Sequence, residues 1–306
     1  PHTFTVKATD SVGNTDQDAY TWTIDSIPPT VGITDGKPSN PSNSKSPAFT
    51  FTASEPTQCK LDAGAFSACT SPKGYINLAD GEHTFTVKAT DTAGNASEAA
   101  NTWTIDATPP TVAITGAKPA SPTNSTSASF SFSASDPTQC KLDGGAFTAC
   151  TSPATYTGLA DGPHTFTVKA TDQAENTAQA SHAWTVDTTP PTVEITGGKP
   201  GDPTNSKSVT FNFTTTESTM ECKLDNGAFA TCASPRSYSL LDGQHTFTVR
   251  ATDAAGNTGQ DSHTWTIDSA APTVAITGEP ANPTKSRSAG FTFTTSEPAQ
   301  CRLDAA

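Results

Sequence analysis

Residues 108–188 read TPPTVAITGAKPASPTNSTSASFSFSASDPTQCKLDGGAFTACTSPATYTGLADGPHTFTVKATDQAENTAQASHAWTVDT. Apolar and polar residues alternate within this stretch, as at Phe130 and Phe132 or at Phe166 and Val168. A period of two residues is typical of half-buried β-strands. Pro, Gly and Asn-Ser clusters separate the alternating runs, and no run has a helical period. The pattern predicts seven strands, near 111–115, 128–135, 138–143, 146–150, 154–159, 164–171 and 182–187.

The same pattern recurs along the chain with a period of 81 residues. Four tryptophans keep this interval: Trp22, Trp103, Trp184 and Trp265. The repeats divide the chain into five parts, which are a partial unit at 1–26 with the C-terminal strands, complete units at 27–107, 108–188 and 189–270, and a partial unit at 271–306 with the N-terminal strands. Seven short strands with one apolar face each predict that every complete unit is an antiparallel β-sandwich.

Composition and charge limit the possible functions. A chain of 306 residues exceeds the size at which single cores stop growing, and its 15 Phe and 4 Trp recur in runs that suit several small cores. The net charge of −13 and the lack of a basic patch argue against a nucleic-acid partner. No apolar stretch approaches the roughly 20 residues that span a bilayer, so we expect no membrane insertion in this segment.

Short proline-rich linkers join consecutive units. The motif Asp-x-x-Pro-Pro-Thr occurs three times, and a fourth copy has alanine in place of the first proline: Asp25–Thr30, Asp106–Thr111, Asp187–Thr192 and Asp268–Thr273. Because proline fixes φ and restricts the residue before it, we expect stiff linkers and an extended rod. The expected partners are therefore the neighbouring repeats of the same chain.

Paired cysteines lie ten residues apart in each complete unit: Cys59 and Cys69, Cys140 and Cys150, Cys222 and Cys232. A three-residue turn centred on the intervening glycine would place the two cysteines directly across a hairpin, where a disulfide is plausible. The alternatives are free core thiols or a zinc pair, but zinc needs about four ligands. We expect the partner of Cys301 to lie just beyond Ala306. Disulfides imply an oxidising, extracytoplasmic location.

Two polar motifs could hold a metal ion. The histidine column of His2, His83, His164 and His245 opens a long strand. Each histidine can be interpreted as a metal ligand or a base, or as a corner residue that ties the strand to the preceding turn. No second His or Cys recurs as a partner in every complete repeat, apart from the cysteine pair, which favours the corner residue. The motif Asp-x-x-x-Asn, from Asp91 to Asn95 and its counterparts, could bind calcium through oxygen ligands or form a hairpin turn. The turn is the favoured interpretation, with calcium kept as a possible cofactor.

Lysine columns could provide a covalent cross-link, and aromatic columns could provide a binding surface. An intramolecular Lys–Asn isopeptide bond is disfavoured because each lysine column is interrupted in one copy, by Arg250, Arg302 or Glu279. Most aromatic residues have the inward parity and cannot form a glycan platform. The residues after the hairpin turn, Phe66, Phe147 and Phe229, have the opposite parity. They are possible lateral contacts in a fibre, unless the turn returns their rings to the core.

The chain carries no phosphate-binding loop, metalloprotease helix or nucleophile elbow, so we expect no catalytic residue and no enzyme activity.

The motifs TPPTVxIT, FxFxAS, CKLDGGAFxxC, LADGxHTFTVKATDxAGN and TWTID together resemble the bacterial Ig-like repeats of large secreted and surface-anchored, adhesin-type proteins. The resemblance covers essentially the whole chain. It implies an all-β tandem array of seven-stranded antiparallel Ig-like β-sandwiches, an extracellular or cell-surface location, and a role as stalk, spacer or adhesin body. Glu175 in one hairpin turn and Ala270–Pro272 in the last linker depart mildly from the pattern.

Three functions are compatible with these features. The first is a structural rod or a fibre formed by lateral self-association. The second is binding of a glycan or another ligand by the repeats themselves, and the third is an accessory role beside a catalytic domain of a secreted enzyme. The loops are polar and nearly identical between copies, which favours the structural role.

Overall fold

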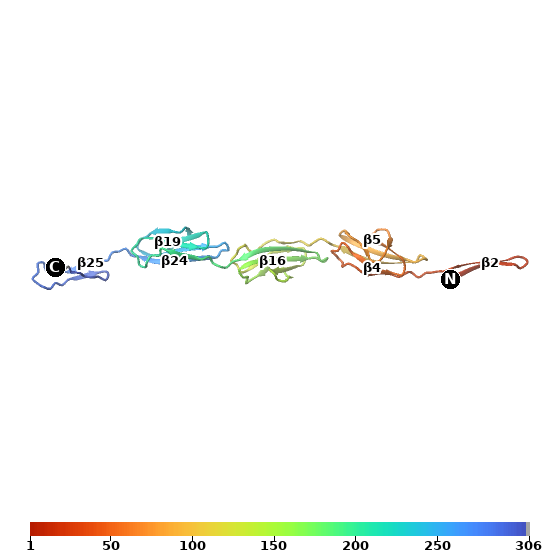
Figure 1. Ribbon diagram of the computed structural model, residues 1–306, viewed down its shortest axis with the longest axis horizontal. Coiled ribbons are helices and arrows are strands. Elements are labelled where there is room, and N and C mark those ends of the chain that lie inside the picture. The colour runs from red at the N-terminus through yellow and green to blue at the C-terminus, as the bar shows by residue number, and fades with distance from the viewer. Residues whose placement is uncertain (304–306) are drawn as a thin grey trace. The chain divides into compact units, whose positions relative to one another are not determined.

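The computed structural model describes residues 1–303, and all of its regular elements are β-strands (Figure 1). The residues separate into two compact units: Pro1–Pro119 with Ser127–Thr157 and Pro163–Trp184, and Ala120–Thr126 with Gly158–Gly162 and Thr185 onward. Among residues 1–303 no helix is long and apolar enough to cross a membrane. The predicted all-β, antiparallel class is therefore confirmed.

In the first unit, the repeat 27–107 consists of two sheets. The three-stranded sheet has the order β3 (Val31–Asp35), β4 (Ala48–Ala53), β7 (Lys73–Gly74). The four-stranded sheet has the order β6 (Ser67–Cys69), β5 (Thr57–Leu61), β8 (Gly81–Thr90), β9 (Ala96–Ile105). Alternate residues of β4 and β9 face inward, as the period of two predicts.

Aromatic rings from the two sheets meet in the core of this repeat. Phe49 of β4 stacks on Phe85 of β8 with ring centroids 4.4 Å apart, and Trp103 of β9 lies 5.1 Å from Phe49. All three side chains are fully buried. The tryptophans of the three complete repeats, Trp103, Trp184 and Trp265, are thus buried and cannot form an exposed glycan platform, whereas Trp22 in the partial repeat is exposed.

Most of the repeat 108–188 belongs to the same unit. Its strands are β10 (Val112–Ile114), β11 (Ala128–Phe130), β12 (Phe132–Ala134), β13 (Thr138–Leu142), β14 (Thr148–Ala149), β15 (Ala154–Tyr156), β16 (Gly162–Thr171) and β17 (Thr177–Val186). They form the pairs β10–β12 and β11–β15 and the sheet β14-β13-β16-β17. The hairpin of β1 (His2–Thr9) and β2 (Thr15–Trp22) precedes both repeats, and its Phe4, Val6 and Tyr20 are exposed.

The second unit contains the repeat 189–270. Its strands are β18 (Val193–Gly197), β19 (Ser208–Thr215), β20 (Met220–Leu224), β21 (Ala230–Thr231), β22 (Arg236–Ser239), β23 (Gly243–Thr252) and β24 (Thr258–Ile267). They form the sheets β18-β19-β22 and β21-β20-β23-β24 around a core that includes Phe211, Phe247 and Trp265. The pair β25 (Val274–Gly278) and β26 (Thr292–Thr295) follows.

Two strand predictions need correction. The last strand was expected at 182–187, but β17 begins at Thr177 and forms a long hairpin with β16. In its first half the half-buried Ala178 and Ala180 alternate with the exposed Thr177, Gln179 and Ser181, so the large apolar residues used for prediction are missing there. The strand expected at 128–135 is divided at Ser131, whose backbone bonds to Thr115 and Ala117 instead of continuing one ladder.

Candidate functional site at the hairpins and repeat junctions

Each cysteine pair lies in the hairpin at the edge of a four-stranded sheet. The Sγ atoms lie 2.04 Å apart in Cys59–Cys69, 2.03 Å in Cys140–Cys150 and 1.94 Å in Cys222–Cys232, with Cα atoms 5.7 Å apart in every pair. These Cα distances are in the range that disulfides require. The structure therefore brings together the three predicted pairs, and the exposed Cys301 has no disulfide partner among residues 1–303.

The cysteines are not directly across the hairpin, so that prediction is wrong. The register places Thr57 opposite Cys69 and Cys59 opposite Ser67, which makes the cysteines diagonal neighbours. The cause is the turn, in which Asp62 has a φ of 53° and the Gly64 N–H donates to the Leu61 carbonyl. This turn centres one residue before the glycine and shifts the facing pairs by two.

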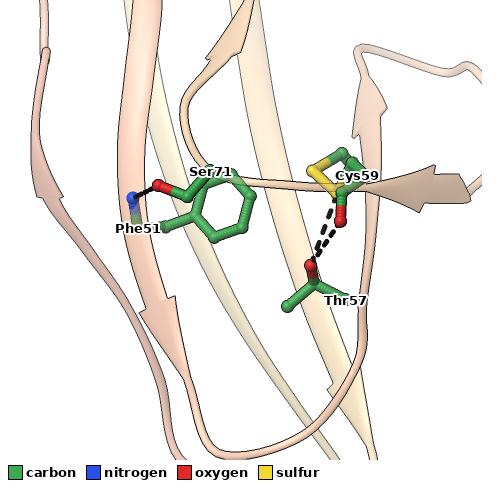
Figure 2. The surroundings of a disulfide bond; sticks show 5 residues. Phe51, Thr57, Cys59 and Ser71 are labelled. Atoms are coloured by element: carbon green, nitrogen blue, oxygen red, sulfur yellow. Dashed lines mark hydrogen bonds between the residues drawn. A yellow bond between two sulfur atoms is a disulfide. The ribbon is translucent and has the colours of Figure 1, made fainter.

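Two side chains fix this hairpin further (Figure 2). The Thr57 hydroxyl donates to the Cys69 carbonyl at 2.8 Å, and Ser71 Oγ accepts the N–H of Phe51 at 2.9 Å. Phe51 belongs to β4 of the other sheet, so the serine ties the end of the hairpin to the opposite layer. The equivalent bonds of Ser152 and Ser234, to Phe132 and Phe213, are also 2.9 Å long.

The histidines of the three complete repeats, His83, His164 and His245, form the predicted corner. His83 Nε2 lies 2.9 Å from the Ala79 carbonyl of the preceding turn, and Nδ1 lies 2.9 Å from Asp62 Oδ2. Both ring nitrogens therefore meet acceptors, and only the doubly protonated ring can donate to both. The Ala79 carbonyl and then Asp62 raise the pKa of His83 above its ordinary value. His245 has the same arrangement with Asp225 and Leu241, and its pKa is also raised, first by Asp225.

The phenylalanines after the hairpin turn lie half-buried on the outer face of the four-stranded sheet. Each ring lies beside two cationic side chains: Lys60 and Lys88 at 4.9 and 5.6 Å from the Phe66 centroid, Lys141 and Lys169 at 4.9 and 4.7 Å from Phe147, and Lys223 and Arg250 at 5.0 and 3.9 Å from Phe229. Phe66 and Phe229 are absent from the cores of their repeats. The alternative in which these rings return to the core is therefore wrong.

The linker that leads into each repeat is held by the Asp-x-x-x-Asn turn. Asp91 Oδ1 accepts the N–H groups of Ala93 and Asn95 at 2.9 and 2.8 Å, and Oδ2 accepts Asn95 Nδ2 at 2.8 Å. The same Nδ2 donates its other hydrogen to the Asp25 carbonyl at 3.1 Å. Asn176 and Asn257 make equivalent bonds of 2.7 Å with the carbonyls of Asp106 and Asp187.

These contacts confirm the turn interpretation of the motif. The carboxylate oxygens of Asp91 are used by N–H donors, and the bonds from Asn95 hold the pKa of Asp91 below its ordinary value. A calcium ion would have to displace these donors from the same oxygens. Within residues 1–303, no three or more His, Cys, Asp and Glu side chains are grouped to hold a metal ion.

The linker that leaves each repeat is held by a second aspartate. Asp106 Oδ1 accepts the Thr108 N–H at 3.0 Å, and Thr108 Oγ1 donates to Asp80 Oδ2 at 3.3 Å. Lys45 Nζ lies 2.9 Å from the other oxygen of Asp80, and this lysine leads the causes that lower the pKa of Asp80. The outgoing linkers at Thr188 and Ser269 are bound in the same way, by Asp161 and Asp242, at 2.8 Å.

Sequence reasoning missed several of these partners. Asp62, Ser71 and Asp80 have identical counterparts at the same places in the other two complete repeats, so their periodicity was a usable signal. Their roles were not visible because each side chain bonds to a residue at least 20 positions away.

Comparison with known proteins identifies the class. Two protein-family models match the sequence: the bacterial Ig-like domain (group 3), at residues 73–129 and 154–225, and the bacterial Ig-like domain, at residues 199–269. Together these matches span more than half of the chain, and the chain belongs to the bacterial Ig-like domain family. No curated protein matches the sequence.

Several solved structures of repeat proteins are similar. A tetra-tandem repeat from the extending region of a large adhesion protein is 22% identical, with 88% of this chain and 81% of that chain covered and a TM-score of 0.34. A Ca²⁺-stabilized adhesin that helps an Antarctic bacterium bind ice is 21% identical, with coverages of 87% and 80% and a TM-score of 0.35. Domains I67–I69 of titin are 13% identical, with coverages of 79% and 98% and a TM-score of 0.41.

Proposed function

We propose that this chain is a structural segment of a large extracellular or cell-surface protein, in which tandem Ig-like domains hold a terminal part away from the surface. The domains of this proposal are the complete repeats 27–107, 108–188 and 189–270, with the partial repeats 1–26 and 271–306 at either side. The family supports a structural role, and the hairpin cysteines suit an oxidising compartment.

One observation carries the spacer role: in each of two repeats, the chain enters and leaves at opposite ends of the same strand. The incoming linker of the repeat 27–107 is bound by Asn95, directly before β9 begins, and the chain leaves after β9 ends at Ile105. In the repeat 189–270, Asn257 and β24 have the same relation. A ten-residue strand is about 33 Å long, so each repeat advances the chain by about that distance.

The side chains at the junctions support stiffness without a cofactor. Each incoming linker is bound by an asparagine of the following repeat, and each outgoing linker by an aspartate of the preceding one. The linker prolines restrict the remaining backbone freedom. Lateral association of such segments into a fibre, through the outer faces that carry Phe66, Phe147 and Phe229, is the finer part of the proposal.

A surface-display experiment tests the spacer role. Between one and six copies of the unit 108–188 are placed between a cell-surface anchor and a peptide tag, and binding of a bulky antibody to the tag is measured. We expect binding to rise with the number of units, because each unit moves the tag outward. A Gly/Ser linker of equal residue number is the matched control, since a flexible chain extends only with the square root of its length. Antibody binding that is independent of unit number, or that rises no faster than in the Gly/Ser control between three and six units, would contradict the role.

A further inference from the structure

The last strand of the repeat 27–107 makes a parallel contact in addition to its antiparallel ladder. Ser42, in the segment between β3 and β4, forms a parallel bridge with Ile105 at the end of β9. The Ser42 N–H donates to the Thr104 carbonyl at 2.9 Å, and the Asp106 N–H donates to the Ser42 carbonyl at 2.9 Å. The Thr104 N–H donates to Asn40 Oδ1 at 3.0 Å. We name these three hydrogen bonds the terminal clamp.

The terminal clamp is present in all three complete repeats. Parallel bridges join Thr123 to Val186 and Thr204 to Ile267, with backbone bonds of 2.9–3.0 Å to Thr185, Asp187, Thr266 and Asp268. The side-chain acceptor differs in each copy but keeps its place: Asn40, Ser121 at 3.1 Å from the Thr185 nitrogen, and Asp202 at 2.9 Å from the Thr266 nitrogen. Three different residue types thus supply the same bond.

The position of the clamp determines how it is loaded when a repeat is stretched. The incoming linker continues through β3 into the segment that contains Ser42, and β9 continues into the outgoing linker. Tension on the incoming linker acts first on β3, which is paired with β4, and through β3 it pulls the Ser42 segment and β9 in opposite directions along their common axis. Bonds that lie across the direction of sliding must be strained together, whereas a hairpin that is pulled open loses its bonds one at a time. A clamp loaded in this way opposes separation of the two ends of the repeat.

The disulfide hairpin lies outside this path. Cys59 and Cys69 are both in the interior of the repeat, between β5 and β6, and neither strand continues into a linker. The bond from the Phe51 N–H to Ser71 Oγ likewise joins two interior segments. It resembles the Thr104–Asn40 bond in chemistry and length, since both run from a backbone N–H to a side-chain oxygen, at 2.9 and 3.0 Å.

We propose that each complete repeat bears tensile load and that its resistance to forced unfolding is set by the terminal clamp. This inference rests on the proposed spacer function, because a spacer between a surface and a held object transmits force along the chain.

Constant-force unfolding of the full chain tests the proposal. The clamp variant combines Asn40→Ala, Ser121→Ala and Asp202→Ala, and the control variant combines Ser71→Ala, Ser152→Ala and Ser234→Ala. We expect the clamp variant to unfold about fivefold faster under force, the factor that corresponds to one hydrogen bond of about 1 kcal/mol. The control should change the forced rate by less than about twofold while lowering the thermal midpoint about as much, because one comparable bond is lost in each repeat of either variant.

A rescue variant separates lost bonding from lost folding. Asn40→Asp with Ser121→Asp keeps an acceptor at every clamp, as Asp202 already provides in the third repeat, and should restore the original forced unfolding rate. Equal acceleration by the clamp and control variants, an unchanged clamp variant, or failure of the rescue would each overturn the proposal. These outcomes are independent of the spacer function, since unfolding under force is measured whether or not the repeats hold a tag away from a cell.

Discussion

Reduction of the three hairpin disulfides should lengthen every unfolding step of this chain by a calculable amount. The cysteines are separated by 10 residues in sequence, and their Cα atoms are held 5.7 Å apart. Ten residues of fully extended chain span about 33–36 Å. Breaking the disulfide therefore releases about 27–30 Å of additional chain in each repeat.

Single-molecule pulling measures this length directly. Between Val31 and Ile105 the ordered part of a repeat should release about 210–235 Å when reduced, once the folded length of about 33 Å is subtracted, and about 27–30 Å less when oxidised. Three such steps are expected from the full chain, one for each complete repeat. The double variant Cys59→Ser with Cys69→Ser should lengthen one of the three steps without a reductant.

Two results would refute the assigned pairs. Steps of equal length with and without reductant would mean that the cysteines are not bridged. If the oxidised chain showed an unfolding step that was shorter by the length of a whole repeat, disulfides would join different repeats. Non-reduced peptide mapping gives the same decision by mass, because it should link Cys59 only to Cys69, Cys140 only to Cys150 and Cys222 only to Cys232.

Three further predictions concern stability. Trp184→Ala should destabilise mainly the repeat 108–188, by about 3–5 kcal/mol, because it truncates a buried aromatic side chain; a variant with unchanged thermal unfolding would show that the indole contributes no core packing. The raised pKa values of His83 and His245 mean that folding favours their protonated forms. The stability that these histidines contribute is fully present below about pH 6.5 and is lost as the pH rises through the higher folded pKa. The double variant His83→Asn with His245→Asn should therefore show a smaller fall of the melting temperature above that pH. An unaltered slope would exclude these histidines as its cause. Asn176→Ala removes the side-chain bonds of Asn176 to the turn and to the linker and should lower the stability of its repeat by about 1–2 kcal/mol. Thermal unfolding of the variant and of the original chain measures this difference. Equal stability of the two would show that these bonds do not hold the junction.

The sequence predicted those features that depend on local periodicity. Phe49, Phe85 and Trp103 occur on alternate positions of their strands, so their burial followed from the period of two. The cysteine pairs followed from a constant spacing around a turn. The start of β17 at Thr177 was missed because the half-buried positions there are the small residues Ala178 and Ala180, which give only a weak apolar signal.

Features that depend on contacts between distant segments were not predictable in the same way. The diagonal placement of Cys59 and Cys69 depends on the backbone conformation of Asp62, which a count of residues does not reveal. The acceptors of the terminal clamp, Asn40, Ser121 and Asp202, recur at the interval of 81 residues and each precedes a proline, but they are chemically different residues, so the sequence did not reveal their common role. Each becomes visible when the last strand is placed beside the segment 64 positions earlier in the chain.

Small-angle scattering of the full chain, recorded with and without a chelator, tests the central claim of an extended structural spacer most directly. Three complete repeats that each advance the chain by about 33 Å, together with the two partial repeats, should give a rod with a maximum dimension well above about 100 Å. The curve should be unchanged by the chelator because prolines and direct hydrogen bonds hold the linkers. A compact particle under both conditions would contradict the spacer. A rod that collapses when the chelator is added would contradict the metal-independent junctions.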